Sequence, residues 1–380
     1  MSQPKILTVF GTRPEAIKMA PVVRVLQHSD DVIGRVCVTG QHRDMLDDVL
    51  NIFDITPHHD LNVMTPNQSL GALTSRILTG LEDILSIQRP DLVLVHGDTT
   101  SCMAATLAAF YAGIPVGHVE AGLRTGDMSA PFPEEANRAI TDRLCSLLFA
   151  PTTSAKENLV KEGIDPTTIT VTGNTVIDAL IWMRQQVRNA PPHQWRSVLG
   201  PAYSHLNNAN ARTVLVTGHR RENLGDGFLR ICKAIATLAR RHPNVHFIYP
   251  VHLNPNVQKP VHEHLGNTSN IHLISPLTYA PFVHLLDSCD LVLTDSGGIQ
   301  EEAPALGKPV VVMRELTERP EAVAAGTVVL VGTDEARIVD EVHRLLTESK
   351  HYDRMSQAHN PYGDGHAAEK ILSTCLDFLR

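Results

Sequence analysis

The chain has no apolar stretch long enough to cross a membrane, and the largely apolar run after Lys5 covers only residues 6–10. A membrane span needs about 20 consecutive apolar residues, and the core of a secretory leader needs about 7 to 15. The sequence therefore predicts no membrane partner and a cytoplasmic location.

Cysteine is scarce, and no two cysteines form a CxxC pair. The pattern excludes a disulfide framework of the kind found in small secreted domains. The histidines contain no HExxH motif, and His262-Glu263-His264 alternate as a solvated stretch would. We therefore predict no metal site and expect the cysteines to be small core residues. They are Cys37, Cys102, Cys145, Cys232, Cys289 and Cys375.

Basic residues are not massed in any stripe or tail, and the formal net charge is −8. A nucleic-acid backbone is therefore not an expected partner. The chain also has no low-complexity tract. Its 380 residues with 43% hydrophobic content can bury a sizeable core, and this length favours two domains over one.

What the chain does have is a repeated alternation of short apolar runs with helical patterns. This rhythm is typical of doubly wound parallel sheets, and its recurrence predicts two Rossmann-like halves. Ligands then belong in the cleft between the halves. The expected strands are 6–10, 35–39, 92–96, 116–119, 147–150 and 169–172 in the first half, and 213–217, 245–250, 271–275, 290–294, 309–313 and 328–331 in the second.

Two segments lie outside this rhythm. Residues 189–212 contain Pro-Pro, Gly-Pro and Asn-Asn-Ala-Asn, a composition that indicates either an interdomain linker or a surface loop. The turn cluster 360–365 precedes a final amphipathic helix over 366–379.

The stretch 293–312 reads as strand, glycine turn, helix and strand. Ser296, Gly297 and Gly298 would leave backbone N–H groups open at the start of a helix, where a diphosphate is favoured. Glu301 and Glu302 follow within reach of ribose hydroxyls. The alternative is an ordinary helix N-cap, for which Ser and Gly are common residues.

The first half offers two cations, Arg13 and Lys18, after its opening strand. There is no GxGxxG motif here, so a dinucleotide site is poorly supported. Two cations at a strand end suit a phosphate or a sugar-linked phosphate. Alternatively, both are solvated surface charges.

Three carboxylates, Asp98, Glu120 and Glu134, come from successive loops at the carboxyl edge of one predicted sheet, and His219 follows the first strand of the second half. Asp98, Glu134 and His219 each have a structural alternative, whereas a Glu at the position of Glu120 is unusual for structure alone. Asp98 could be an N-cap, Glu134 could serve only the helix dipole, and His219 could be a structural group.

Long ordered motifs that span nearly the whole chain closely resemble those of bacterial non-hydrolysing UDP-N-acetylglucosamine 2-epimerases. They are FGTRPEAIK (10–18), HGDT (96–99), HVEAGLRT (118–125), PEEAN (133–137), TGHR (217–220), DSGGIQEEAP (295–304), TERPE (317–321) and NPYGDG (360–365).

The resemblance implies an α/β protein of glycosyltransferase type B architecture, with two Rossmann-like domains and an interdomain active-site cleft. It places the first domain at 1–173, with the C-terminal helix 366–380 packing back on it, and the UDP-binding domain at 174–365. In that arrangement, 189–212 becomes an internal loop of the second domain. The resemblance further implies a homodimer that needs no cofactor and no metal.

Carried over residue by residue, the family's roles fall on two sets. The catalytic residues are Asp98, Glu120, Glu134 and His219. The substrate-binding residues are Arg13, Lys18, Leu277, Phe282, Ser296, Gly297, Gly298, Glu302 and Arg319. At Leu277 some relatives carry Gln, and a backbone contact would survive that difference.

The implied reaction interconverts UDP-N-acetylglucosamine and UDP-N-acetylmannosamine, which supplies precursors for bacterial surface polysaccharide. The C2 hydrogen is not next to a carbonyl, so inversion is expected to proceed by elimination of UDP to a 2-acetamidoglucal and re-addition. Two proton carriers are needed, which explains a set of carboxylates. Which carboxylate takes the C2 proton stays open. The rivals are a hydrolysing epimerase, a type B glycosyltransferase and a UDP-sugar sensor without turnover.

Some members of this family bind a second UDP-N-acetylglucosamine as an activator, coupled to domain closure. The matching positions here are Gln41, Glu134, Arg220 and His252. Asp44 stands where such members have Gln, and its carboxylate could repel a diphosphate.

Overall fold

A computed structural model of the chain describes residues 3–41, 43–206 and 211–380. The chain forms two compact units, Met1–Ala179 with Tyr362–Arg380 and Leu180–Pro361. The side chain of Asp44 and residues 207–210 of the expected linker lie outside the described residues.

The first unit is built on a seven-stranded parallel sheet with the order β3-β2-β1-β4-β5-β6-β7. β1 and β4 are buried on both faces, as parallel strands covered by helices must be. All six strands expected here are confirmed within two residues at each end. β3 was not expected, because two residues are too short to show a pattern. The strands are β1 (Lys5–Phe10), β2 (Ile33–Val38), β3 (His59–Asp60), β4 (Leu92–His96), β5 (Val116–Val119), β6 (Leu147–Ala150) and β7 (Ile169–Val171).

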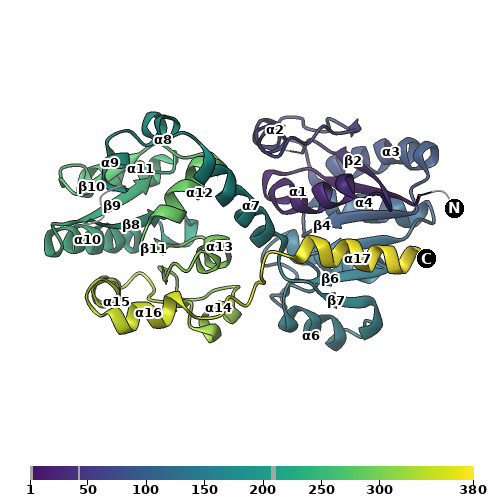
Figure 1. Ribbon diagram of the computed structural model, residues 1–380. Coiled ribbons are helices and arrows are strands. Elements are labelled where there is room, and N and C mark those ends of the chain that lie inside the picture. The colour runs from purple at the N-terminus through teal and green to yellow at the C-terminus, as the bar shows by residue number, and fades with distance from the viewer. Residues whose placement is uncertain (1–2, 42, 207–210) are drawn as a thin grey trace. The chain divides into compact units, whose positions relative to one another are not determined.

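Helices cover this sheet, and one of its cores lies where α3 and α4 pack on β1, β4 and β5. The last helix, α17, packs against α1 and is drawn in yellow in Figure 1. The helices are α1 (Arg13–His28), α2 (Arg43–Ile52), α3 (Leu70–Gln88), α4 (Thr100–Tyr111), α5 (Glu134–Leu144), α6 (Thr153–Lys161), η1 (Pro166–Thr168), α7 (Thr175–Asn189), in which the division between the units falls, and α17 (Ala367–Leu379).

The second unit has a six-stranded parallel sheet with the order β10-β9-β8-β11-β12-β13. The six strands expected for this half are confirmed, with ends within one residue. One core of this sheet is formed with α10 and α15, whose apolar faces pack on the strands. The strands are β8 (Arg212–Thr217), β9 (Val245–Pro250), β10 (Ile271–Ile274), β11 (Leu291–Thr294), β12 (Val310–Val312) and β13 (Val328–Leu330).

The helices of the second unit precede, connect and follow these strands. They are α8 (Pro192–Leu199), η2 (Gly200–Ala202), α9 (Tyr203–Leu206), η3 (Arg221–Asn223), α10 (Asp226–Arg241), α11 (Pro255–Leu265), α12 (Tyr279–Ser288), α13 (Ile299–Ala305), α14 (Pro320–Ala325), α15 (Glu335–Thr347) and α16 (Ser349–Ser356).

The expectation of a linker or loop over 189–212 is wrong, because this segment forms α8, η2 and α9. Pro192 occupies the first turn of α8, a position where a missing N–H costs nothing. Trp195 is buried and stacks on His284, with ring centroids 4.7 Å apart. The local composition favoured a loop, but burial of this large side chain against α12 stabilises the helix.

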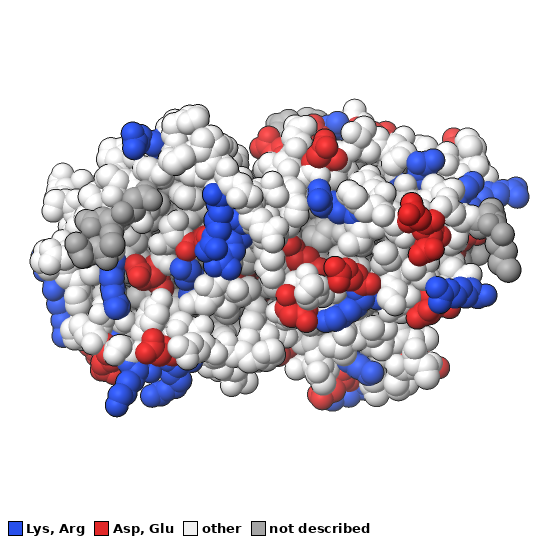
Figure 2. Space-filling model, in the orientation of Figure 1, with Lys and Arg blue, Asp and Glu red and all other residues white. Residues whose placement is uncertain are grey.

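The cysteines are free thiols, and all except the half-buried Cys145 are buried, as expected. No helix in the described part of the chain is long and apolar enough to span a membrane. On the face shown in Figure 2, basic and acidic side chains are interspersed.

Candidate active site

Glu120 is a carboxylate of the first unit with three close polar neighbours. It follows β5 directly and has a left-handed backbone with φ +70°, which a residue with a Cβ rarely adopts. Its Oε2 pairs with Nζ of Lys18 and accepts a 2.8 Å hydrogen bond from the side-chain amide of Asn174. Nε2 of His96 lies 3.8 Å from the same oxygen. A strained backbone that aims a partnered carboxylate is typical of functional sites.

His96 is fully buried at the end of β4, and burial lowers its pKa to about 3. Neither ring nitrogen has a hydrogen-bond partner among the described residues. The imidazole is therefore neutral at physiological pH, and it closes one side of Glu120 without adding a charge.

Asp98 and Glu120 are neighbours because of strand register. His96 of β4 pairs with Val119 of β5, and the backbone N–H of Gly97 donates to the carbonyl of Val119 at 3.0 Å. Each carboxylate thus follows one of two paired strand ends. The alternative that Asp98 is an N-cap is wrong, because the N-cap of α4 is Thr99, whose hydroxyl accepts from the backbone N–H of Cys102.

Asp98 is instead held by α5. Its carboxylate pairs with the guanidinium of Arg138, and its backbone carbonyl accepts a 2.9 Å bond from the amide of Asn137. Glu134 opens the same helix one turn before Arg138, so the two share a helix face. Oε2 of Glu134 is buried and has no hydrogen-bond partner within the described residues. The structure therefore brings Glu134 close to the Asp98 loop.

Glu15 connects two loops of the candidate site, and the sequence analysis gave it no role. Its carboxylate accepts bonds from the backbone N–H groups of Gly11 and Thr12 at 2.9 and 2.7 Å and from the hydroxyl of Thr99 at 2.5 Å. Burial raises its pKa. Glu15 therefore connects the turn after β1 to the loop that holds Asp98. Arg13 and Lys18 follow that turn on α1. Glutamate three residues after Thr12 is a capping-box signal that could have found Glu15.

Gln41 belongs to the same edge of this sheet. Its side-chain oxygen accepts a 2.8 Å hydrogen bond from Ser101, which also shares a 2.8 Å bond with Thr39. Gln41 is thereby fixed beside the first turn of α4.

In the second unit, Asp295 joins the loops that follow β8 and β11. Its fully buried carboxylate accepts 2.9 Å bonds from the backbone N–H groups of both His219 and Arg220. The sequence analysis quoted Asp295 within a motif but gave it no role. Its place directly after an apolar strand was the available signal.

His219 stacks on His252, with ring centroids 5.0 Å apart and an interplanar angle of 8°. Burial lowers the pKa of His219, while the nearby carboxylate of Asp295 opposes that shift. The guanidinium of Arg220 lies so close to Gly297 that a Cβ there would be 3.6 Å from Nη2. These contacts gather His219, Arg220, His252 and Gly297 at the carboxyl edge of the second sheet.

The turn 296–298 precedes α13, whose N-cap is Gly298 with no side-chain capping bond. The turn thus contains the N-cap of α13, as the alternative expected, but the cap is Gly298 and no side chain completes it. The backbone N–H of Ser296 bonds to the hydroxyl of Thr294 at 2.9 Å, whereas those of Gly297 and Gly298 donate to no described residue. Two open N–H groups in a glycine turn can bind an anion.

The remaining predicted residues of the second unit are Leu277 and Arg319 on loops, Phe282 on α12 and Glu302 on α13. Arg319 pairs with the buried Glu301, and the neighbouring Glu302 is half-buried. Leu277 and Phe282 follow β10 and are half-buried. Within the described residues, no hydrogen bond or ring contact joins Leu277 or Phe282 to the others.

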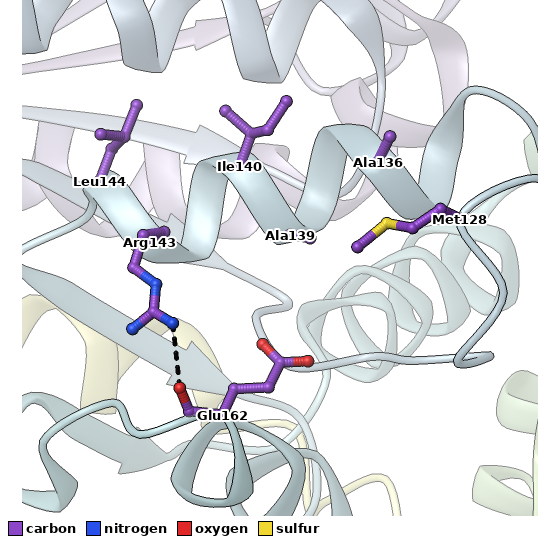
Figure 3. Close-up of a pocket in the computed structure, with 7 residues that line it drawn as sticks. All are labelled: Met128, Ala136, Ala139, Ile140, Arg143, Leu144 and Glu162. Carbon is purple, nitrogen blue, oxygen red and sulfur yellow. Dashed lines mark hydrogen bonds between the residues drawn. The ribbon is translucent and has the colours of Figure 1, made fainter.

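A groove elsewhere on the first unit contains none of the predicted site residues. One side is the exposed face of α5, and Arg143 bonds to the backbone carbonyl of Glu162 at 3.0 Å across it (Figure 3). Its lining residues are Met128, Ala136, Ala139, Ile140, Arg143, Leu144 and Glu162.

Comparison with known proteins shows which family the chain resembles. The family model described as UDP-N-acetylglucosamine 2-epimerase matches residues 24–376. The UDP-N-acetylglucosamine 2-epimerase of Yersinia pestis is 58% identical over 97% of each chain.

Solved structures show the same likeness. The UDP-GlcNAc 2-epimerase of Neisseria meningitidis bound to UDP-GlcNAc is 50% identical, with a TM-score of 0.88 over 98% of this chain and 100% of that chain. The enzyme of Methanocaldococcus jannaschii in complex with UDP-GlcNAc and UDP is 32% identical, with a TM-score of 0.78 over 98% and 99% of the two chains. The predicted α/β fold of the glycosyltransferase type B class is confirmed. The chain belongs to the UDP-N-acetylglucosamine 2-epimerase family and is an isomerase.

Proposed function

We propose that this epimerase interconverts UDP-N-acetylglucosamine and UDP-N-acetylmannosamine without hydrolysis, through loss and re-addition of UDP. The observation that carries the proposal is the set of three carboxylates at one sheet edge, with Glu120 held by Lys18 and Asn174. Inversion at C2 needs one group that removes a proton and another that returns it on the opposite face.

The proposed reaction balances as follows. A base takes the C2 proton, the electrons of that C–H bond form the C1–C2 double bond, and the C1–O bond breaks with its electron pair on UDP. The glycal then receives a proton at C2 from the other face, and the UDP oxygen attacks C1. The sugar regains one proton and UDP, so no water is consumed, and the protonated base and deprotonated acid return to their starting forms by proton exchange with solvent.

Asp98, Glu120 and Glu134 are the proposed proton carriers. The ion pair with Lys18 favours the ionised form of Glu120, which a base requires. The unpartnered Oε2 of Glu134 leaves a buried oxygen for a substrate hydroxyl or a proton.

The departing UDP gains negative charge, and the proposed groups that stabilise it are Arg13, Lys18, His219 and the turn that starts at Ser296. Backbone N–H groups and cations aimed at developing charge are a strong source of rate enhancement. Glu302 and Arg319 are assigned to the uridine side, with Leu277 and Phe282 completing the nucleotide-binding set.

The test is incubation of pure protein with UDP-N-acetylglucosamine in deuterated water. We expect UDP-N-acetylmannosamine with deuterium at C2. Free N-acetylmannosamine with stoichiometric UDP would establish the hydrolysing reaction instead. Binding without any turnover would establish a UDP-sugar sensor, and sugar transfer to an acceptor would establish a glycosyltransferase.

A further inference from the structure

Three histidines of the second unit lie together away from the residues assigned to the nucleotide sugar. His246 on β9 and His272 on β10 are on the same face of adjacent strands, because Phe247 pairs with Ile271. His205 of α9 stacks over both, with ring centroids 3.7 Å from His246 and 4.6 Å from His272. One nitrogen of each ring lies within 4.8 Å of the other two.

We propose that His205, His246 and His272 bind one divalent first-row transition cation, such as Zn²⁺, with water completing the coordination shell. Imidazole nitrogens bind Zn²⁺ at about 2.0–2.1 Å, which separates two tetrahedral ligands by about 3.3 Å. Nδ1 of His246 and Nε2 of His272 are 3.1 Å apart. These two atoms are already spaced as a ligand pair, and the ring of His205 must tilt out of its stack to supply the third.

The chemistry of the cluster favours this class of cation. All three donors are nitrogens and no carboxylate belongs to the group, so a hard cation such as Mg²⁺ or Ca²⁺ is a poor fit. Burial and the neighbouring histidines lower the pKa of His272 to about 4, and burial also lowers that of His246. Both rings are therefore neutral near pH 7, the state in which imidazole binds a metal.

A bound cation would link α9, β9 and β10 to one another. β10 is an edge strand of its sheet, and α9 is only four residues long. The three ligands come from separate elements, so the site exists only in the folded chain. Binding should then stabilise the second unit against unfolding, since a ligand that binds the native state alone shifts the equilibrium toward it.

The test is a Zn²⁺ titration by calorimetry of untagged, metal-free protein, together with thermal unfolding in Zn²⁺ and in EDTA. We expect one Zn²⁺ bound at the cluster and a higher unfolding midpoint with Zn²⁺. His246→Gln and His272→Gln should each weaken that site by more than about 100-fold, because loss of a ligand exceeds the 10- to 100-fold effect of losing an outer partner.

The matched control is His343→Gln. His343 also lies beside another histidine, with its Nδ1 3.0 Å from Nε2 of His242, but only two rings meet there. The control should retain the Zn²⁺ site. If His246→Gln fails to fold, His205→Gln on α9 provides the same comparison, and Co²⁺ absorption gives an independent readout of nitrogen ligation. No Zn²⁺ binding by the wild type, unchanged binding by the cluster variants, or equal loss in His343→Gln would each overturn the proposal.

Discussion

The side-chain amide of Asn174 donates a 2.8 Å hydrogen bond to Oε2 of Glu120, the oxygen that also pairs with Lys18. Asn174 has a second contact, in which its Oδ1 accepts the backbone N–H of Val176 at 3.0 Å. One residue therefore starts α7 and also orients the carboxylate after β5. Its two roles can be separated by substitution.

Asn174→Asp keeps an oxygen for Val176 but replaces the donor by a second carboxylate beside Glu120. We expect kcat to fall by about 10-fold or more, because Glu120 loses a hydrogen bond and gains a like charge, while the unfolding midpoint changes little. Steady-state rates and thermal unfolding measure the two effects. Asn189→Ala, at the exposed end of the same helix, is the control. Equal kcat in Asn174→Asp and wild type would exclude this positioning role.

The three carboxylates can be neutralised with little change of shape. Asp98→Asn, Glu120→Gln and Glu134→Gln should each lower kcat by about 100-fold or more while UDP still binds, because their proposed task is proton transfer. Epimer formation followed by NMR gives the rates. The exposed Glu157→Gln is the control for loss of a charge. Near-normal turnover of Glu134→Gln would leave that residue with only its helix-dipole role.

Glu302→Ala should weaken the binding of UDP itself by about 10-fold, because a carboxylate that accepts ribose hydroxyl bonds is lost. Calorimetry with UDP measures this affinity in the absence of turnover. Glu263→Ala, an exposed carboxylate of α11, should bind UDP as the wild type does. If the affinities of Glu302→Ala and wild type agree, Glu302 does not contact the nucleotide.

Asp178 gives a pH-dependent prediction. It is buried on α7, where burial raises its pKa to about 6 although the backbone N–H of Ala368 donates to it at 2.8 Å. Between the ordinary aspartate pKa of 3.8 and about 6, the folded state holds more protons than the unfolded state, so this group's contribution to stability is lost as pH rises through that window.

Asp178→Asn removes that titration and retains an oxygen for Ala368. The unfolding midpoint of the variant minus that of the wild type should increase from pH 4 to about pH 6 and then remain constant. Thermal unfolding across this range is the measurement, with the exposed Asp377→Asn as a control. A difference that does not vary with pH would show that Asp178 has an ordinary pKa.

The activator proposed at Gln41, Glu134, Arg220 and His252 predicts a kinetic lag in the reverse reaction. UDP-N-acetylmannosamine alone should react slowly until UDP-N-acetylglucosamine accumulates, because the activator shifts the population toward the active state. Initial rates with and without a trace of UDP-N-acetylglucosamine measure the lag. Identical progress curves from the first seconds would rule out an obligatory activator.

Much of the fold was readable from the sequence because a parallel strand covered on both faces must be a continuous apolar run. The runs around Leu92–His96 and Leu291–Thr294 are of this kind, and helices and glycine turns separate them. The polar residues that follow such runs, including Asp98, Glu120 and His219, were predicted as site residues for the same reason, since strand ends mark the edge where sites form.

Tertiary structure decided what has no local signal. α8 forms because Trp195 packs on His284, although the surrounding prolines and asparagines are typical of a loop. Likewise, Asn174 is far from Glu120 in the chain, and His205 is far from His246. Only the packing of separate elements brings the members of each pair together. Sequence periodicity records which face of an element is buried, whereas the partner across the contact depends on how the chain folds back on itself.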